Sequence, residues 1–205
     1  MGAFVFVALF AGICVSAQDQ PPANGAKWML EYEGKSENEL ARDPRLEQFL
    51  MRSLPTTELP SFHEPVNHAA VRFIWGVPGI LWVKTHRYVI ASGCPAHACV
   101  ERGLLWVDVQ NDTTVFVATR DEEENSDRTT SSQYPIASTK LVIATKADLS
   151  PEKLPDSLRG AIIEWLHIEG VLRLREVTLL TPRGVSAITT DQLCWSGPCS
   201  QVRWQ

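Results

Sequence analysis

The sequence predicts an α+β protein: an antiparallel β-sheet with helices packed on one face, followed by a C-terminal extension of a helix and a strand. Two segments, residues 36–51 and 156–169, combine apolar residues at helical spacing with start and stop signals. Between them, several short segments alternate apolar and polar residues as half-buried strands do, with turn residues separating them. Strands that follow one another through short turns pair antiparallel, and the helices then cover the sheet.

The first helical segment has two start signals. Ser36 can cap a short helix, with Glu39 three residues later. Pro44 divides the segment, so a second and better helix begins with Asp43 as its cap and Pro44 in its first turn. Before these helices, Trp28, Leu30 and Tyr32 occupy every second position over residues 28–33, which indicates a short edge strand.

From residue 70 onward the pattern has the period of strands, because Val71, Phe73 and Trp75 occupy every second position. The best hairpin signal is Gln110-Asn111-Asp112 between two apolar segments. A helix is expected from Asp156 to Glu169, with Gly170 as its stop. We expect strands within residues 70–75, 80–83, 88–91, 104–109, 113–118, 141–145 and 171–180.

The chain of 205 residues is 44% apolar and contains seven tryptophans, which suffices for one domain with a substantial core. Its net charge of −5 argues against a nucleic-acid partner. The expected organisation is a signal peptide over 1–17, a leader or edge segment over 18–33, an α+β core over 34–120, an acidic loop over 121–135, and a C-terminal extension with a disulfide-closed tail over 136–205.

Residues 1–17 carry no charge and end in Val15-Ser16-Ala17 before a polar stretch, which is typical of a signal peptide cleaved after Ala17. The segment is too short to span a bilayer comfortably, and no later segment is apolar enough to do so. We therefore expect a secreted or periplasmic protein. A lipoprotein anchored through Cys14 is the alternative.

Export leaves an even number of cysteines, which predicts two disulfides. The simplest pairing is Cys94–Cys99 and Cys194–Cys199, because both pairs have the same spacing. Pairing between the two loops remains possible. A zinc ion held by Cys94, His97 and Cys99 is another alternative, although no fourth ligand is evident nearby. We expect no metal and no other cofactor.

The segment Cys94–Cys99 encloses a proline and one histidine, so a disulfide would close a small ring with His97 at its tip. We interpret this ring as a probe that presents an imidazole to a partner. The alternative is a stapled turn in which His97 is incidental. Ser92 and His97 could be imagined as a nucleophile and base, but no acidic residue lies nearby in sequence to orient the histidine. We therefore expect that the protein is not an enzyme.

The segment Tyr88–Cys99 resembles the signature of the Ivy family, which are secreted inhibitors of vertebrate-type lysozyme: a Tyr-led strand, a small residue and a Cys-x-x-His-x-Cys ring. With its flanking helix and strands, the resemblance covers about residues 34–118. It implies a loop of Cys94, Pro95, Ala96, His97, Ala98 and Cys99 that enters the active site of a c-type lysozyme or a related glycan hydrolase. The family's ring carries Lys, Pro and Asp where this chain has Pro95, Ala96 and Ala98.

Two alternative functions are compatible with these sequence features. The first is a secreted binding protein with a protein partner, such as a c-type lysozyme, whose cleft takes up the ring. The second is a non-inhibitory structural or adaptor module of the cell envelope that has the same fold, which the altered ring favours. In either case we expect no nucleic acid and no stable membrane span, and a homodimer is possible.

Overall fold

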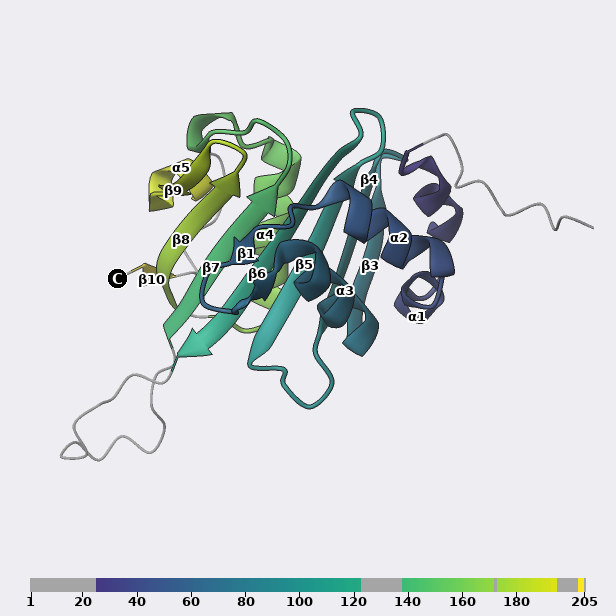
Figure 1. Ribbon diagram of the computed structural model, residues 1–205, viewed down its shortest axis with the longest axis horizontal. Coiled ribbons are helices and arrows are strands. Elements are labelled where there is room, and N and C mark those ends of the chain that lie inside the picture. The colour runs from purple at the N-terminus through teal and green to yellow at the C-terminus, as the bar shows by residue number, and fades with distance from the viewer. Residues whose placement is uncertain (1–24, 123–137, 172, 195–202, 205) are drawn as a thin grey trace, which may run out of the picture.

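The computed structural model describes residues 25–122, 138–171, 173–194 and 203–204. Its centre is an eight-stranded sheet in the order β10-β8-β7-β6-β5-β4-β3, with β9 paired to β8 (Figure 1). Two further short strands, β1 and β2, form a separate pair. In chain order the elements are η1 Lys27–Tyr32, α1 Glu37–Ala41, α2 Pro44–Ser53, β1 Glu58–Leu59, β2 Glu64–Pro65, α3 Val66–Gly76, β3 Val77–Lys84, β4 Tyr88–Cys94, β5 Glu101–Asp108, β6 Thr113–Glu122, β7 Ser138–Thr145, η2 Pro151–Lys153, α4 Asp156–Ile168, β8 Arg173–Thr181, β9 Gly184–Ala187, α5 Thr190–Cys194 and β10 Arg203–Trp204.

The α+β class and a mainly antiparallel sheet are confirmed. Strands β3 to β7 pair antiparallel with their sequence neighbours. Strand β8 pairs parallel with β7. Helix α4 lies between them and carries the chain back to the end of the sheet where β7 begins, so both strands run in the same direction. The strands of the C-terminal extension therefore continue the same sheet.

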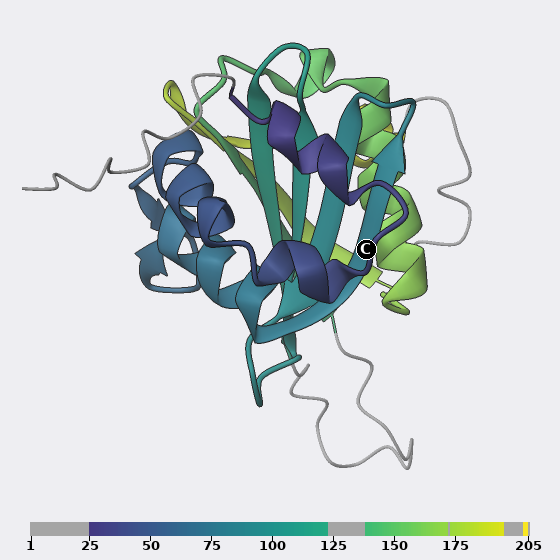
Figure 2. The same cartoon turned by 90° about the vertical axis from the view of Figure 1, so that its right-hand side faces the viewer.

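The helices cover both faces of the sheet (Figure 2). One face packs against η1, α2 and α3, and the other packs against α4. The expectation of helices on one face therefore holds for the N-terminal helices, whereas α4 lies opposite them. The reason is visible in β5, where the residues from Gly103 to Asp108 are all buried. A continuous buried run of this kind needs cover on both faces.

The predicted helix starts near Ser36 and Asp43 are confirmed. Ser36 and Glu39 form a capping box at α1, and the Asp43 side chain accepts a hydrogen bond from the Arg45 N–H at the start of α2. Pro44 takes the first position of α2, where its missing N–H removes no helical hydrogen bond.

The expected edge strand over residues 28–33 is wrong, because residues 27–32 form the 3-10 helix η1. Trp28, Met29 and Tyr32 are its buried residues, so Met29 points inward where a strand would turn it outward. The Tyr32 hydroxyl donates a hydrogen bond to the buried Asp43 carboxylate, which also pairs with Arg45 at 2.7 Å. This contact ties η1 to the first turn of α2.

The strand predicted within residues 70–75 is also wrong, because these residues belong to helix α3. Its buried residues include Val66, Ala69, Ala70, Phe73 and Ile74, which recur at intervals of three and four. The alternation of Val71, Phe73 and Trp75 is therefore incidental.

The other predicted strands and the helix from Asp156 are present. No helix in the described part of the chain is long and apolar enough to cross a membrane. Several expectations concern residues that the structure does not describe. These are the signal peptide and its cleavage after Ala17, the anchoring Cys14, residues 18–24 of the leader, and residues 123–135 of the acidic loop.

Candidate functional site

The loop between β4 and β5 is closed by the predicted disulfide between Cys94 and Cys99, whose Cα atoms are 5.0 Å apart. The loop projects beyond the end of the sheet (Figures 1 and 2). Because both sulfur atoms are used in this bond, neither is a thiolate that could bind a metal, which overturns the zinc alternative. We call residues 94–99 the His97 loop.

His97 stands at the tip of this loop and is exposed. The Ala98 N–H donates a hydrogen bond of 3.1 Å to the Pro95 carbonyl, which makes His97 the third residue of a β-turn. Its φ of +66° is the value that a type II turn requires at this position. Positive φ alone does not single out His97, because His63 and His86 share it; only His97 lies within a disulfide ring.

The end of helix α3 supports the base of the loop by close backbone contact. A Cβ atom at Gly76 would lie 2.2 Å from the Cys94 carbonyl oxygen and 2.9 Å from the Ala96 nitrogen. A Cβ atom at Gly93 would lie 2.4 Å from the Phe73 carbonyl oxygen. These two glycines allow the helix and the loop to approach each other, and the contact fixes the direction in which the loop projects.

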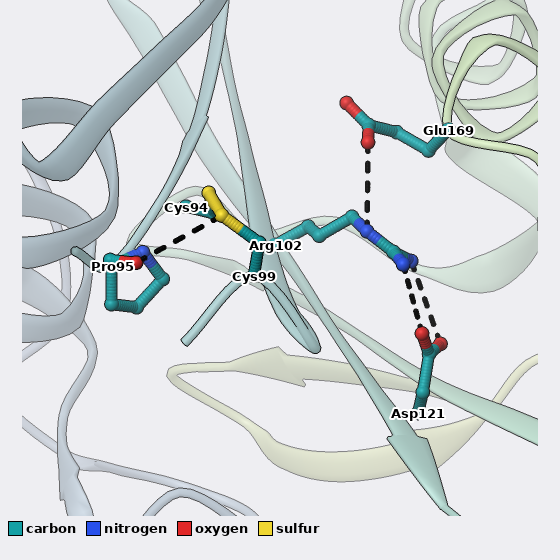
Figure 3. Close-up of a disulfide and its surroundings, with 6 residues drawn as sticks. All are labelled: Cys94, Pro95, Cys99, Arg102, Asp121 and Glu169. Atoms are coloured by element: carbon teal, nitrogen blue, oxygen red, sulfur yellow. Dashed lines mark hydrogen bonds and ion pairs between the residues drawn. A yellow bond between two sulfur atoms is a disulfide. The ribbon is translucent and has the colours of Figure 1, made fainter. Parts of the chain in front are cut away.

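A polar network lies next to the disulfide (Figure 3). Arg102 on β5 pairs with Asp121 on β6 at 2.9 Å and with Glu169, after α4, at 3.5 Å. The Thr139 hydroxyl donates to the same Asp121 carboxylate at 2.8 Å. All three charged side chains are partly buried, and their ion pairs join the end of α4 to the end of the sheet from which the His97 loop projects.

A shallow cavity of about 170 Å³ lies between the disulfide and this network. Its lining includes both cysteines, the first residues of β3, Arg102 and Glu169. The Sγ atom of Cys99 lies 4.0 Å from the Pro95 carbonyl oxygen, and since a disulfide sulfur carries no hydrogen we treat this as a packing contact.

Ser92 does not face His97. Its side chain is 2% exposed, and its Oγ accepts a hydrogen bond of 3.1 Å from the Ile80 N–H on β3. The contact lies where the pairing of β3 with β4 shifts between Pro78 and Leu81. Ser92 therefore stabilises an irregularity in the sheet, and it offers no nucleophile to the loop.

Several exposed apolar residues lie near the His97 loop in the chain or in the sheet. Of the five large apolar residues that are exposed among the described residues, Val77 pairs in register with Cys94, Trp75 precedes Gly76, and Val100 follows Cys99. A fourth, Ile168, precedes Glu169, which lines the cavity beside the loop. Trp75 belongs to α3 and Ile168 to α4, on opposite faces of the sheet, so these residues share one end of the molecule.

The sequence did not predict Trp75 as part of this surface, because residues 70–75 were expected to form a strand. The signal that could have found it is the apolar spacing of α3 described above, which leaves Trp75 on the outer side of the helix. Arg102 was also missed; a single arginine in a strand gives no sequence signal of its ion pairs.

The second predicted disulfide falls only partly within the described residues. Cys194, at the end of α5, is disulfide-bonded. Cys199, its expected partner, lies outside the described residues. In the described part of the chain, no three His, Cys, Asp or Glu side chains are placed to hold a metal ion.

The fold and this site define an α+β protein that carries a disulfide-closed loop with an exposed histidine at one end of its sheet. No family model, no curated protein and no solved structure matches the chain.

Proposed function

We propose that this is a secreted or periplasmic binding protein that inserts the His97 loop into the active-site cleft of a c-type lysozyme or a related glycan hydrolase. The observation that carries the proposal is the exposed His97 at the tip of a turn closed by the Cys94–Cys99 disulfide. The resemblance of residues 88–99 to the Ivy signature names the class of target. A disulfide is also in keeping with an oxidising compartment.

The chemistry of such a target suits an imidazole. Glycan hydrolases of this type cleave with two carboxyl groups that flank the scissile bond. A histidine placed between them can hydrogen-bond to both, and as imidazolium it forms charge-assisted bonds. The disulfide and the contact with α3 order the loop before binding, which reduces the conformational entropy that binding costs.

The residues beside His97 are compatible with a narrow cleft. Pro95 is buried, while Ala96 and the half-buried Ala98 flank the histidine with single methyl groups. The tip therefore carries no second charge that would have to be desolvated on entry. Lysozymes of this class are generally basic, so the net charge of −5 on this chain favours encounter over longer distances.

The test is an enzyme assay. The mature protein, oxidised and at micromolar concentration, is added to several c-type lysozymes acting on cell-wall suspensions, and the initial rate of clearing is measured. We expect slower clearing, and we expect His97→Ala to abolish most of the effect. No slowing with any of the lysozymes would contradict inhibition and leave the alternative, an envelope structural or adaptor module, as the better account.

A further inference from the structure

A groove of about 350 Å³ opens beside the His97 loop, between α1 and the end of α3. This volume lies within the range of pockets that take a ligand or a side chain. The groove is lined by Asn38, Ala41, Arg42, Trp75, Gly76 and Pro78.

The groove and the loop share one surface. Gly76 belongs to the groove lining, and a Cβ atom placed on it would lie 2.9 Å from both the Pro95 Cα and the Ala96 nitrogen. Pro78, also in the lining, pairs in register with Gly93 just before the loop. Figure 2 shows α1 lying across the sheet near the end from which the loop projects. A partner protein whose cleft surrounds His97 therefore also reaches the groove.

Two side chains of the groove are available to a partner. The Trp75 side chain is 43% exposed. Arg42 is exposed, and within the described residues its guanidinium has no hydrogen-bond or ion-pair partner. Two other arginines near this end of the molecule are already occupied: Arg72 pairs with Glu64 and Glu101, and Arg102 pairs as described above.

We propose that the groove is a second contact on the same docking surface and that it takes an acidic side chain from the rim of the partner's cleft. The carboxylate pairs with Arg42, and the methylene groups pack against Trp75. This inference rests on the proposed function and specifies the chemistry that the partner offers next to its catalytic carboxyl groups.

The charge of the groove favours an acidic occupant. Its lining holds one guanidinium, that of Arg42, and one amide, that of Asn38, which donates a hydrogen bond of 3.0 Å to the neighbouring Glu37 carboxylate. Arginine binds carboxylates through two parallel hydrogen bonds, which adds geometric specificity to the attraction. Tryptophan and arginine are also the residue types that most often dominate the binding energy of protein interfaces. An unpaired cation beside an apolar ring is thus suited to a partner whose cleft is lined with acids.

The test compares five variants, His97→Ala among them, with the wild-type protein by isothermal titration calorimetry against a c-type lysozyme that the wild type inhibits. Arg42→Glu and Trp75→Ala are expected to raise the Kd at least tenfold, while Trp75→Phe retains part of the affinity. Arg52→Glu is the matched charge control, because Arg52 is exposed at the far end of α2. It should change the Kd less than twofold. Circular dichroism and thermal unfolding verify that each variant is folded.

The outcomes separate this inference from the proposed function. Binding that is lost with His97→Ala but unaffected by Arg42→Glu and Trp75→Ala would overturn the groove contact and leave the His97 loop as the docking element. Equal weakening by Arg42→Glu and Arg52→Glu would also overturn it, because the effect would then come from net charge. A wild-type protein that binds none of the lysozymes would refute both.

Discussion

The contact between Gly76 and the base of the His97 loop gives the sharpest prediction about the fold. We consider Gly76→Ala, which adds one methyl group at the last residue of α3. The new Cβ atom would lie 2.2 Å from the Cys94 carbonyl oxygen, 2.9 Å from the Ala96 nitrogen and 2.9 Å from the Pro95 Cα. All three are backbone atoms, so no side chain can rotate away.

The magnitude follows from these distances. Relief of the shortest contact requires the helix and the loop to separate by roughly 1 Å, and forcing an extra methyl into a packed site typically costs about 1–3 kcal/mol. For a chain of this size each kcal/mol lowers the Tm by about 2–4 °C. We therefore expect the Tm of Gly76→Ala to fall by roughly 2–12 °C relative to the wild type.

Differential scanning calorimetry of the oxidised protein measures this shift. The matched control is Gly160→Ala in the exposed middle of α4, where nothing lies within 4 Å of the added Cβ atom. This control should stabilise the protein by up to about 1 kcal/mol, because alanine is the better helix former. A Gly76→Ala protein with an unchanged or higher Tm would refute the argument that α3 fixes the base of the loop.

Three further predictions concern the Cys94–Cys99 disulfide and the hydrogen bonds that Tyr32 and Arg45 donate to Asp43. Replacing both Cys94 and Cys99 by Ser should lower the free energy of unfolding by about 2 kcal/mol, the chain-entropy value for so short a loop, in urea titrations; an unchanged midpoint would contradict it. Burial raises the pKa of the Asp43 carboxyl, but hydrogen bonds from Arg45 and Tyr32 outweigh this and hold the pKa below its usual range. The stability that this carboxylate provides is therefore complete above its unfolded pKa of about 3.9 and is lost as the pH falls through the lower folded value. Asp43→Asn should be less stable than the wild type at pH 7 by about 1–3 kcal/mol, and this deficit should shrink as the pH falls below about 3.9; a deficit that stays constant with pH would exclude this cause. Tyr32→Phe removes the hydrogen bond that the Tyr32 hydroxyl donates and leaves those from Arg45, so it should show the same trend with a smaller size.

The caps were the features most directly predictable from the sequence. Ser36 with Glu39 and Asp43 with Pro44 are local signals, because each capping hydrogen bond joins residues at most three positions apart. The hairpin at Gln110–Asp112 and the Cys94–Cys99 ring are local for the same reason.

Features that depend on tertiary packing were harder to predict. The segment from Val66 to Gly76 alternates over its last residues, and only its packing on the sheet through Phe73 and Ile74 distinguishes a helix from a strand. To predict that α4 lies on the opposite face, one must know that residues 104–107 of β5 are buried on both faces of the sheet. A continuous apolar run in a central strand is the pattern that indicates it.

The candidate site could be predicted only in part. The ring and the exposed imidazole follow from the spacing of Cys94, His97 and Cys99. The groove formed by Arg42 and Trp75 joins residues from α1 and α3 that lie more than thirty positions apart in the chain. No sequence pattern connects them, so this part of the surface required the structure.

The central claim is that His97 enters an acidic cleft, and a competition measurement tests it most directly. Binding of the oxidised protein to a c-type lysozyme is measured by calorimetry with the cleft free and with the cleft saturated by an oligosaccharide. His97→Ala is compared with His86→Ala, since His86 is also exposed with positive φ but lies in the β3–β4 turn, at the other end of β4 from the loop. We predict that the oligosaccharide and His97→Ala each abolish binding while His86→Ala leaves it intact. Binding that persists with the cleft occupied, or that His97→Ala and His86→Ala affect equally, would contradict the account.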